Sequence, residues 1–200
     1  MTDRSDLASA TFRPPATLLT VAGSIGLLAS FVLSADKVTL LEDKIAGKTT
    51  TFSCDLSAFV SCGDVMASPQ SSAFGFPNAF IGILGFAVVL TLGVVWLAGA
   101  PVQRRIWAGL QAGALFGIAF VTWLQFQSIY KIGFLCPYCM VVWAVMIPIF
   151  VVVTAGSLRM VAPNSRLSRF VSNWTLLIVA LWYLAVGAAI WFEYGSRLWA

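Results

Sequence analysis

The chain contains no histidine and has few charged residues. Of its 200 residues, 10% are Asp, Glu, Lys or Arg, against about 25% in a typical soluble domain. The low charge excludes an ordinary soluble domain. The absence of histidine excludes a histidine-ligated haem and a histidine general base, and any zinc site would need all four cysteines. The basic residues form no patch interleaved with aromatic residues, so nothing indicates a nucleic-acid partner.

Long uncharged stretches take the place of the missing charge. A helix that crosses a bilayer needs about 20 apolar residues, and five stretches without Asp, Glu, Lys or Arg meet this length: 16–35, 79–99, 106–128, 138–156 and 174–192. They predict an all-α integral membrane protein with five transmembrane helices in a lipid bilayer. The first stretch is too long for the apolar part of a cleaved signal peptide, so we interpret it as a retained helix.

The charged residues that remain predict how the chain is oriented. An N-terminus in the cytoplasm places seven basic residues inside and five outside, a modest positive-inside bias. This topology makes residues 1–15 a cytoplasmic tail and 157–173 a cytoplasmic loop, with the fifth helix and a short tail in 174–200. The only long loop, 36–77, is then extracytoplasmic. It is apolar enough to pack onto the outer end of the helices, and we expect a short helix in it.

Four cysteines fall on this same predicted extracytoplasmic face. Cys54 and Cys62 lie in the long loop, and Cys136 and Cys139 lie where the fourth helix begins. The Cys136-Pro137-Tyr138-Cys139 segment is a CxxC motif at a helix start, where residues three apart share a face within disulfide range. The positive end of the helix stabilises a thiolate at Cys136. These features indicate thiol–disulfide exchange at the plasma (inner) membrane.

Other roles for the cysteines remain open at this point. A Cys₄ zinc site is disfavoured because Cys54 and Cys62 lack the close spacing of a zinc knuckle, and we predict no metal. Two inert structural disulfides are a second possibility. In one straight helix Cys54 and Cys62 would lie about 12 Å apart, beyond the reach of a disulfide. Either the loop bends between them, or each meets a different partner.

The motifs together resemble the vitamin K epoxide reductase family, in its bacterial disulfide-forming branch. The resemblance covers residues 16–156 and has the loop cysteine pair before the membrane CxxC pair. Its matching pieces are Cys54-Asp55, Ser61-Cys62, Ser68, Phe74-Gly75-Phe76-Pro77-Asn78 and Cys136-Pro137-Tyr138-Cys139. It implies a four-helix transmembrane bundle around a quinone, menaquinone or ubiquinone, capped by the extracytoplasmic loop and followed by the fifth helix.

The resemblance also implies roles for individual residues. Cys139 would face the quinone, Cys136 would be its partner, Cys62 would exchange with Cys136, and Cys54 would meet the protein substrate. The remaining candidates are quinone-site residues. Asn78 would hydrogen-bond a quinone oxygen, and Ser68 would support the site. Trp143 stands where the family has a ring-contacting tyrosine. Phe74 and Phe76 are candidate ring contacts, although packing is the commoner role of such residues.

The implied function is a thiol–quinone oxidoreductase that supports disulfide bond formation. Because no thioredoxin-like domain follows the fifth helix within the 200 residues, we expect the thiol partner to be a separate DsbA-like thioredoxin-fold protein. Two alternatives differ in kind. One is a quinone or vitamin K epoxide reductase that recycles a cofactor, and the other is a non-enzymatic membrane scaffold with structural disulfides.

Overall fold

The structure is a computed structural model that describes residues 15–48, 52, 54–55 and 59–198. The tail predicted for residues 1–15 lies outside this set except for Pro15. Within the described residues, five helices are long and apolar enough to cross a membrane. They are α2 (Ala16–Ile45), α4 (Ala79–Leu97), α5 (Arg104–Gln127), α6 (Pro137–Val161) and α8 (Thr175–Leu198). The prediction of an all-α, multi-pass membrane protein is therefore confirmed.

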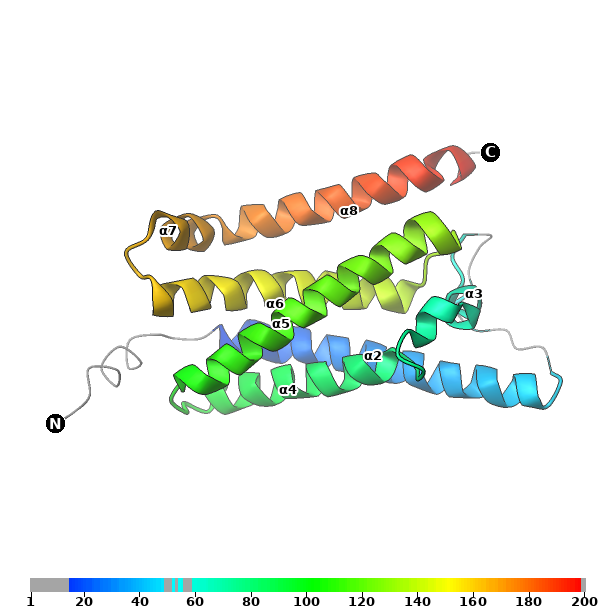
Figure 1. Cartoon of the computed structure of the whole chain (residues 1–200), viewed down its shortest axis with the longest axis horizontal. Coiled ribbons are helices and arrows are strands. Elements are labelled where there is room, and N and C mark those ends of the chain that lie inside the picture. Colours follow the sequence, from blue (N-terminus) through cyan, green and yellow to red (C-terminus); the bar gives the residue numbers. More distant parts are fainter. Residues whose placement is uncertain (1–14, 49–51, 53, 56–58, 199–200) are drawn as a thin grey trace.

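Close backbone contact holds the first two long helices together. A Cβ atom on Gly23 would lie 2.8 Å from the backbone nitrogen of Leu90, and one on Gly93 would lie 2.7 Å from that of Thr20. Glycine at these positions lets α2 and α4 approach closely, as small residues do between membrane helices. The fourth helix, α6, packs on both α2 and α5, and α8 lies along the outer side of α6 (Figure 1).

The α4 and α5 helices diverge from the turn that joins them. They make few contacts although they are consecutive in the chain, and α5 crosses the bundle at an angle to α4 (Figure 1). At its far end α5 continues as one π-helical turn, Ser128–Ile132, which ends at Gly133 in the left-handed conformation. Tyr194 of α8 donates its hydroxyl to the carbonyls of Ser128 and Ile129. The fifth helix thus braces the segment that leads to the CxxC motif.

The first helix extends further than its apolar stretch. The prediction ended it at residue 35, but α2 continues to Ile45 and closes at Gly47, whose φ is 67°. Its 30 residues span about 45 Å, longer than the hydrocarbon core of about 30 Å. The boundary was misplaced because a charged residue, Asp36, ends an apolar run but does not end a helix. The loop predicted to begin at residue 36 is correspondingly shorter.

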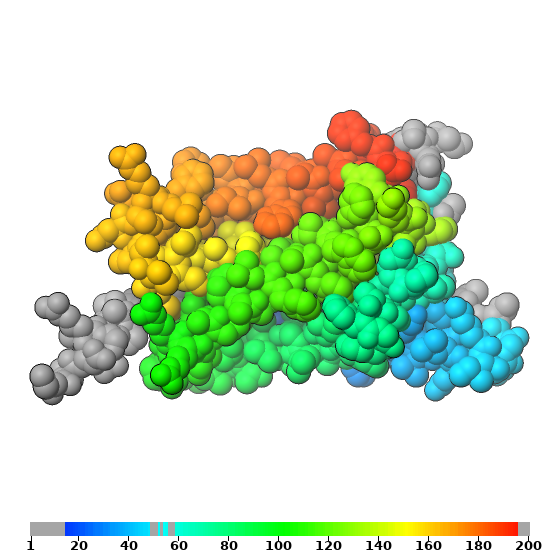
Figure 2. All heavy atoms as spheres, viewed as in Figure 1, coloured from blue at the N-terminus to red at the C-terminus, as the bar shows by residue number. Residues whose placement is uncertain are grey.

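The segment between α2 and α4 contains the expected short helix. The last part of this segment, residues 59–78, is called the cap below. It holds α3 (Cys62–Ala67) and a 3₁₀ turn, Pro69–Ser72. Ser61 is the N-cap of α3 and accepts the backbone N–H of Asp64 at 3.1 Å. The cap fills the surface between the outer part of α2 and the end of α5 (Figure 2).

The connection predicted for residues 157–173 is only partly a loop. The fourth helix runs to Val161, and the short helix α7 (Arg166–Asn173) occupies most of the rest. Ser165 is its N-cap and accepts the backbone N–H of Ser168 at 3.0 Å. Within residues 157–173, only 162–165 lie outside a helix.

Candidate active site

The loop cysteines form a disulfide. The Cα atoms of Cys54 and Cys62 lie 5.7 Å apart, so the chain bends between them. The Asp55 carboxylate stabilises the bend: its oxygens accept the backbone N–H of Phe52 at 3.0 Å, the backbone N–H of Gly63 at 3.1 Å and the hydroxyl of Ser61 at 2.9 Å. One side chain therefore ties the residues before Cys54 to the residues on both sides of Cys62.

The same contacts change the acidity of Asp55. Partial burial acts to raise the pKa of its carboxyl, but the hydrogen bonds from Phe52, Gly63, Ser61 and Cys62 outweigh burial and lower the pKa from its ordinary value. The carboxylate form is the one that accepts these bonds. The bend is therefore stabilised by a negative charge.

Backbone hydrogen bonds place the cap beside the CxxC motif. The Ser61 N–H donates to the Leu135 carbonyl at 3.1 Å, and the Leu135 N–H donates to the Phe59 carbonyl at 2.9 Å. Ser61 directly precedes Cys62, and Leu135 directly precedes Cys136. As a result, the sulfur atoms of Cys62 and Cys136 lie 3.3 Å apart, although 74 residues separate them in the chain. Both residues are fully buried.

The CxxC cysteines carry free thiols at the start of α6. Cys136 is the N-cap, and Pro137 is the first helical residue, where its missing N–H costs no hydrogen bond. A hydrogen bond with the Cys139 thiol, aided by the N–H groups of Cys139 and Tyr138, lowers the pKa of Cys136 from its ordinary value. These bonds outweigh the opposing effects of burial and of the Asp36 carboxylate. The thiol nearest the loop disulfide is thus the one inclined to ionise.

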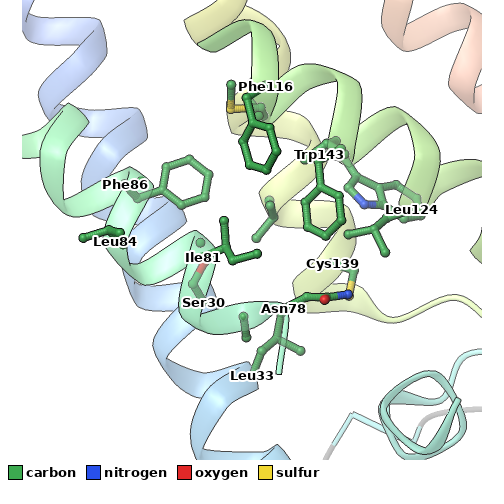
Figure 3. A pocket seen from close by; sticks show the side chains of 18 of the residues that line it. Ser30, Leu33, Asn78, Ile81, Leu84, Phe86, Phe116, Leu124, Cys139 and Trp143 are labelled. Carbon is green, nitrogen blue, oxygen red and sulfur yellow. The ribbon is translucent and has the colours of Figure 1, made fainter. Parts of the chain in front are cut away.

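A cavity of about 630 Å³ lies behind the cysteines, between α2, α4, α5 and α6. It falls within the range of about 300–1,000 Å³ that small-molecule sites occupy, and its walls are mostly apolar. Three of the predicted site residues, Asn78, Cys139 and Trp143, gather at one side of it (Figure 3). Ser68 lines it as well. The cavity can hold a flat apolar ring against the thiol of Cys139.

The cap positions the polar residues of the cavity. The Asn78 side chain donates to the Gln70 carbonyl at 2.6 Å and accepts the Ala73 N–H at 3.0 Å. An asparagine amide has two N–H donors, and Gln70 takes one of them. Ser68 donates its hydroxyl to the Val65 carbonyl at 2.6 Å. Both side chains are oriented by cap backbone, so the cap shapes the polar end of the cavity.

The structure separates two candidates from the others. Phe74 and Phe76 stack on each other with ring centroids 6.3 Å apart, and their side chains are 52% and 44% exposed. Neither lines the cavity as the described residues form it. Phe74 instead packs on Phe120, which does line the cavity, with centroids 5.5 Å apart. In this structure the pair covers the outside of a cavity wall.

Sequence reasoning missed one charged residue of the cavity. Lys37 lines it and is buried, with its ammonium group bonded to the Met66 carbonyl and, at 2.9 Å, to the Ser71 hydroxyl. It was overlooked because residues 36 onward were expected to form a loop. The spacing of Leu33, Lys37 and Leu40 on one helix face was the available signal.

A buried sulfur–sulfur contact between a disulfide and a CxxC motif, next to an apolar cavity among membrane helices, defines a membrane-embedded thiol oxidoreductase. The comparison with protein families agrees. Residues 17–154 match the model of the vitamin K epoxide reductase family, and the chain belongs to this family. No curated protein matches the chain. Family membership supports a membrane redox enzyme of the thiol–quinone oxidoreductase kind, because enzymes of this family use quinones.

Proposed function

We propose that this protein reoxidises a separate DsbA-like thioredoxin-fold protein and passes two electrons to menaquinone or ubiquinone. The observation that carries the proposal is the 3.3 Å separation of the Cys62 and Cys136 sulfur atoms. At that distance a disulfide can move from one pair to the other without a large movement of the chain. The resemblance of the motifs to disulfide-forming members of the family supports the same direction of electron flow.

The relay begins at the loop pair. A thiolate of the partner attacks Cys54 and releases Cys62, and the second thiol of the partner then releases Cys54, which leaves the partner oxidised. The Cys62 thiolate attacks Cys136 of a Cys136–Cys139 disulfide and releases the Cys139 thiolate. Cys54 next attacks Cys62, which restores the loop disulfide and frees Cys136. Each step is thiolate attack on a disulfide sulfur.

The oxidation states of the cysteines in the structure match those that these steps leave behind. The loop pair is a disulfide and the CxxC pair is reduced. The CxxC dithiol then gives two electrons and two protons to the quinone and becomes a disulfide again. Cys139 and Asn78 both line the cavity, which supports a role for the Asn78 amide in holding a ring oxygen while Cys139 faces the ring. Trp143 and Ser68 complete this end of the site.

The proposed orientation places the relay outside the cytoplasm. The N-terminus and the segment that holds α7 would be cytoplasmic, and the end with the four cysteines would face the extracytoplasmic side of the plasma (inner) membrane. The modest positive-inside bias supports this arrangement, and so does the need for an oxidising compartment around a disulfide-forming system.

Trapping the intermediate between the two pairs tests the proposal. In a Cys54→Ala, Cys139→Ala variant, Cys62 and Cys136 have no other cysteine to pair with, so we expect them to form a disulfide in membranes when a mild oxidant such as diamide takes up the two electrons. Alkylation without reductant followed by peptide mapping detects it. A Cys54→Ala, Cys136→Ala variant is the matched control, because it retains Cys139 in place of the neighbouring Cys136. Free thiols at Cys62 and Cys136 in a folded variant, with quinone present, would contradict the relay.

A further inference from the structure

Lys37 lies on the face of α2 that packs against the cysteines. Leu33, Lys37 and Leu40 follow one another at helical spacing, and each is only 8% exposed. The two leucines pack in the same cluster as Cys62 and Cys136. Lysine is rarely this buried without a paired charge. A buried lysine beside the two cysteine pairs is therefore unusual and suggests a function.

The contacts of Lys37 satisfy part of its ammonium group. The Nζ atom donates to the Met66 carbonyl and to the Ser71 hydroxyl. No carboxylate pairs with it among the residues that the structure describes. An ammonium group has three donors, and a buried charge without a counter-ion is costly. One N–H of the ammonium group, and its positive charge, can therefore still interact with another group.

The cavity gives such a group access to Lys37. Lys37, Ser71 and Asn78 all line it, and they are linked, because the Asn78 N–H donates to the Ser71 carbonyl at 2.9 Å. The cationic end of Lys37 therefore lies in the cap-side polar wall that also holds Asn78. The rest of the lining, as the described residues form it, is mostly apolar and includes no Asp or Glu. The arrangement suits a flat apolar ring that carries a negative oxygen.

We propose that Lys37 is the anion-binding group of this cavity, so that the site prefers a quinoid ring bearing an ionised oxygen to a neutral ring of the same shape. The inference rests on the proposed function, since it assigns the cavity to quinones. Lys37 keeps its proton, and no bond to it forms or breaks. Its charge favours negative charge at this end of the cavity, which is where electrons leave Cys139.

A matched pair of rings tests the preference. The probes are 2-hydroxy-3-methyl-1,4-naphthoquinone, which is ionised at neutral pH, and 2,3-dimethyl-1,4-naphthoquinone, which is neutral and nearly the same shape. Binding is measured by equilibrium dialysis on quinone-extracted protein with both cysteine pairs oxidised, so that no electrons pass. We expect the anionic ring to bind the wild-type protein about tenfold more tightly, as a charge-assisted hydrogen bond allows.

Variants separate the charge of Lys37 from its contacts with the cap. Lys37→Met should abolish the preference, and Lys37→Arg should retain it. Ser71→Ala removes one hydrogen bond but leaves the charge, so most of the preference should survive. Lys48→Met is the control, because Lys48 is an exposed lysine just beyond the end of the same helix, and it should change nothing.

The outcomes distinguish this inference from the function on which it rests. Equal affinity of the wild-type protein for the two rings, or an unchanged preference in Lys37→Met, would overturn the role of Lys37 and leave the thiol–quinone reaction standing. Binding of neither ring would overturn the quinone step itself, and this inference with it.

Discussion

At the residue scale, the reactive sulfur atoms are placed by contacts that their neighbours make. The Asp55 carboxylate holds the bend that joins Cys54 to Cys62, and the backbone of Ser61 and Leu135 brings Cys62 to Cys136. The first contact shapes the loop pair, and the second brings that pair to the CxxC motif. Protonation or substitution of Asp55 should therefore change how fast the Cys54–Cys62 disulfide is reduced.

The lowered pKa of Asp55 predicts a pH dependence. A carboxyl whose pKa is lower in the folded state stabilises that state above its ordinary pKa of about 3.8, and this stabilisation is lost as the pH falls through the lowered value. We expect reduction of the Cys54–Cys62 disulfide by a phosphine to become faster as the pH falls below about 4. The rate is measured by alkylation of the released thiols.

Asparagine at position 55 removes the titrating group. In Asp55→Asn, the Cys54–Cys62 disulfide should be reduced about tenfold faster than in the wild-type protein at neutral pH. Its reduction rate should no longer rise as the pH falls below about 4. Asp64→Asn is the control, because Asp64 is an exposed acid in the first turn of α3, two residues after Cys62. An Asp55→Asn variant with the wild-type profile would show that the carboxylate does not hold the bend.

At the scale of elements, the bundle combines one tight helix pair with one open pair. The glycines of α2 and α4 allow backbone contact, whereas α4 and α5 separate after their shared turn. The tight pair gives α4 and the outer part of α2, which carries Lys37, a rigid base. The open pair leaves room for the cavity. The helix pair that stabilises the bundle is thus different from the helix pair that leaves room for a ligand.

The tight pair should not tolerate a methyl group. In Gly23→Ala the new Cβ would lie 2.8 Å from the backbone nitrogen of Leu90, so the helices must move apart, at a cost of about 1–3 kcal/mol. Thermal unfolding in detergent measures the loss. Gly187→Ala on α8 is the control, because no atom lies within 4 Å of its added Cβ. Equal stability of the two variants would show that α2 and α4 can separate without cost.

At the scale of the whole molecule, the cavity opens towards lipid as well as towards the cysteines. Leu84 and Phe116 line it, yet they are 70% and 52% exposed on the surface of the membrane-spanning helices. A quinone dissolved in the bilayer can therefore reach Cys139 without entering water. In the proposed function, the protein partner would instead approach the loop pair, on the cap side of the cavity. The fold would then keep the two proposed substrates apart and join them through the four cysteines.

Filling the cavity should block the quinone step and leave the exchange between the two cysteine pairs intact. Gly113 lines the cavity, and nothing lies within 4 Å of a Cβ placed there, so phenylalanine can project into the space. We expect Gly113→Phe to lower copurified quinone about tenfold and to leave Cys136 and Cys139 reduced in cells. Exchange between Cys62 and Cys136 in the trapping variant should persist. Quinone content is measured by solvent extraction and chromatography.

Gly187→Phe, on the exposed side of α8, is the matched control for this substitution. It adds the same side chain to a membrane helix outside the cavity and should leave the quinone content unchanged. If Gly113→Phe retains wild-type quinone, the ring binds elsewhere and the assignment of the cavity is wrong.

The sequence by itself determined the five helices and the CxxC motif at the start of α6. These features depend on nearest neighbours: an uncharged stretch of about 20 residues seeks the bilayer, and residues three apart on a helix share a face. The short cap helix was likewise predictable, because apolar residues in a long loop must pack somewhere. The motifs between residues 54 and 139 also carried the family resemblance.

Only the tertiary structure decided how these parts meet. The contact of Cys62 with Cys136 and the burial of Lys37 depend on residues far away in the chain, as does the exclusion of Phe74 and Phe76 from the cavity wall. Spacing left the partner of Cys54 open, because a bend stabilised by Asp55 does not appear in a count of residues. Hydropathy measures the tendency of a segment to leave water, and it carries no information about which segment it will pack against.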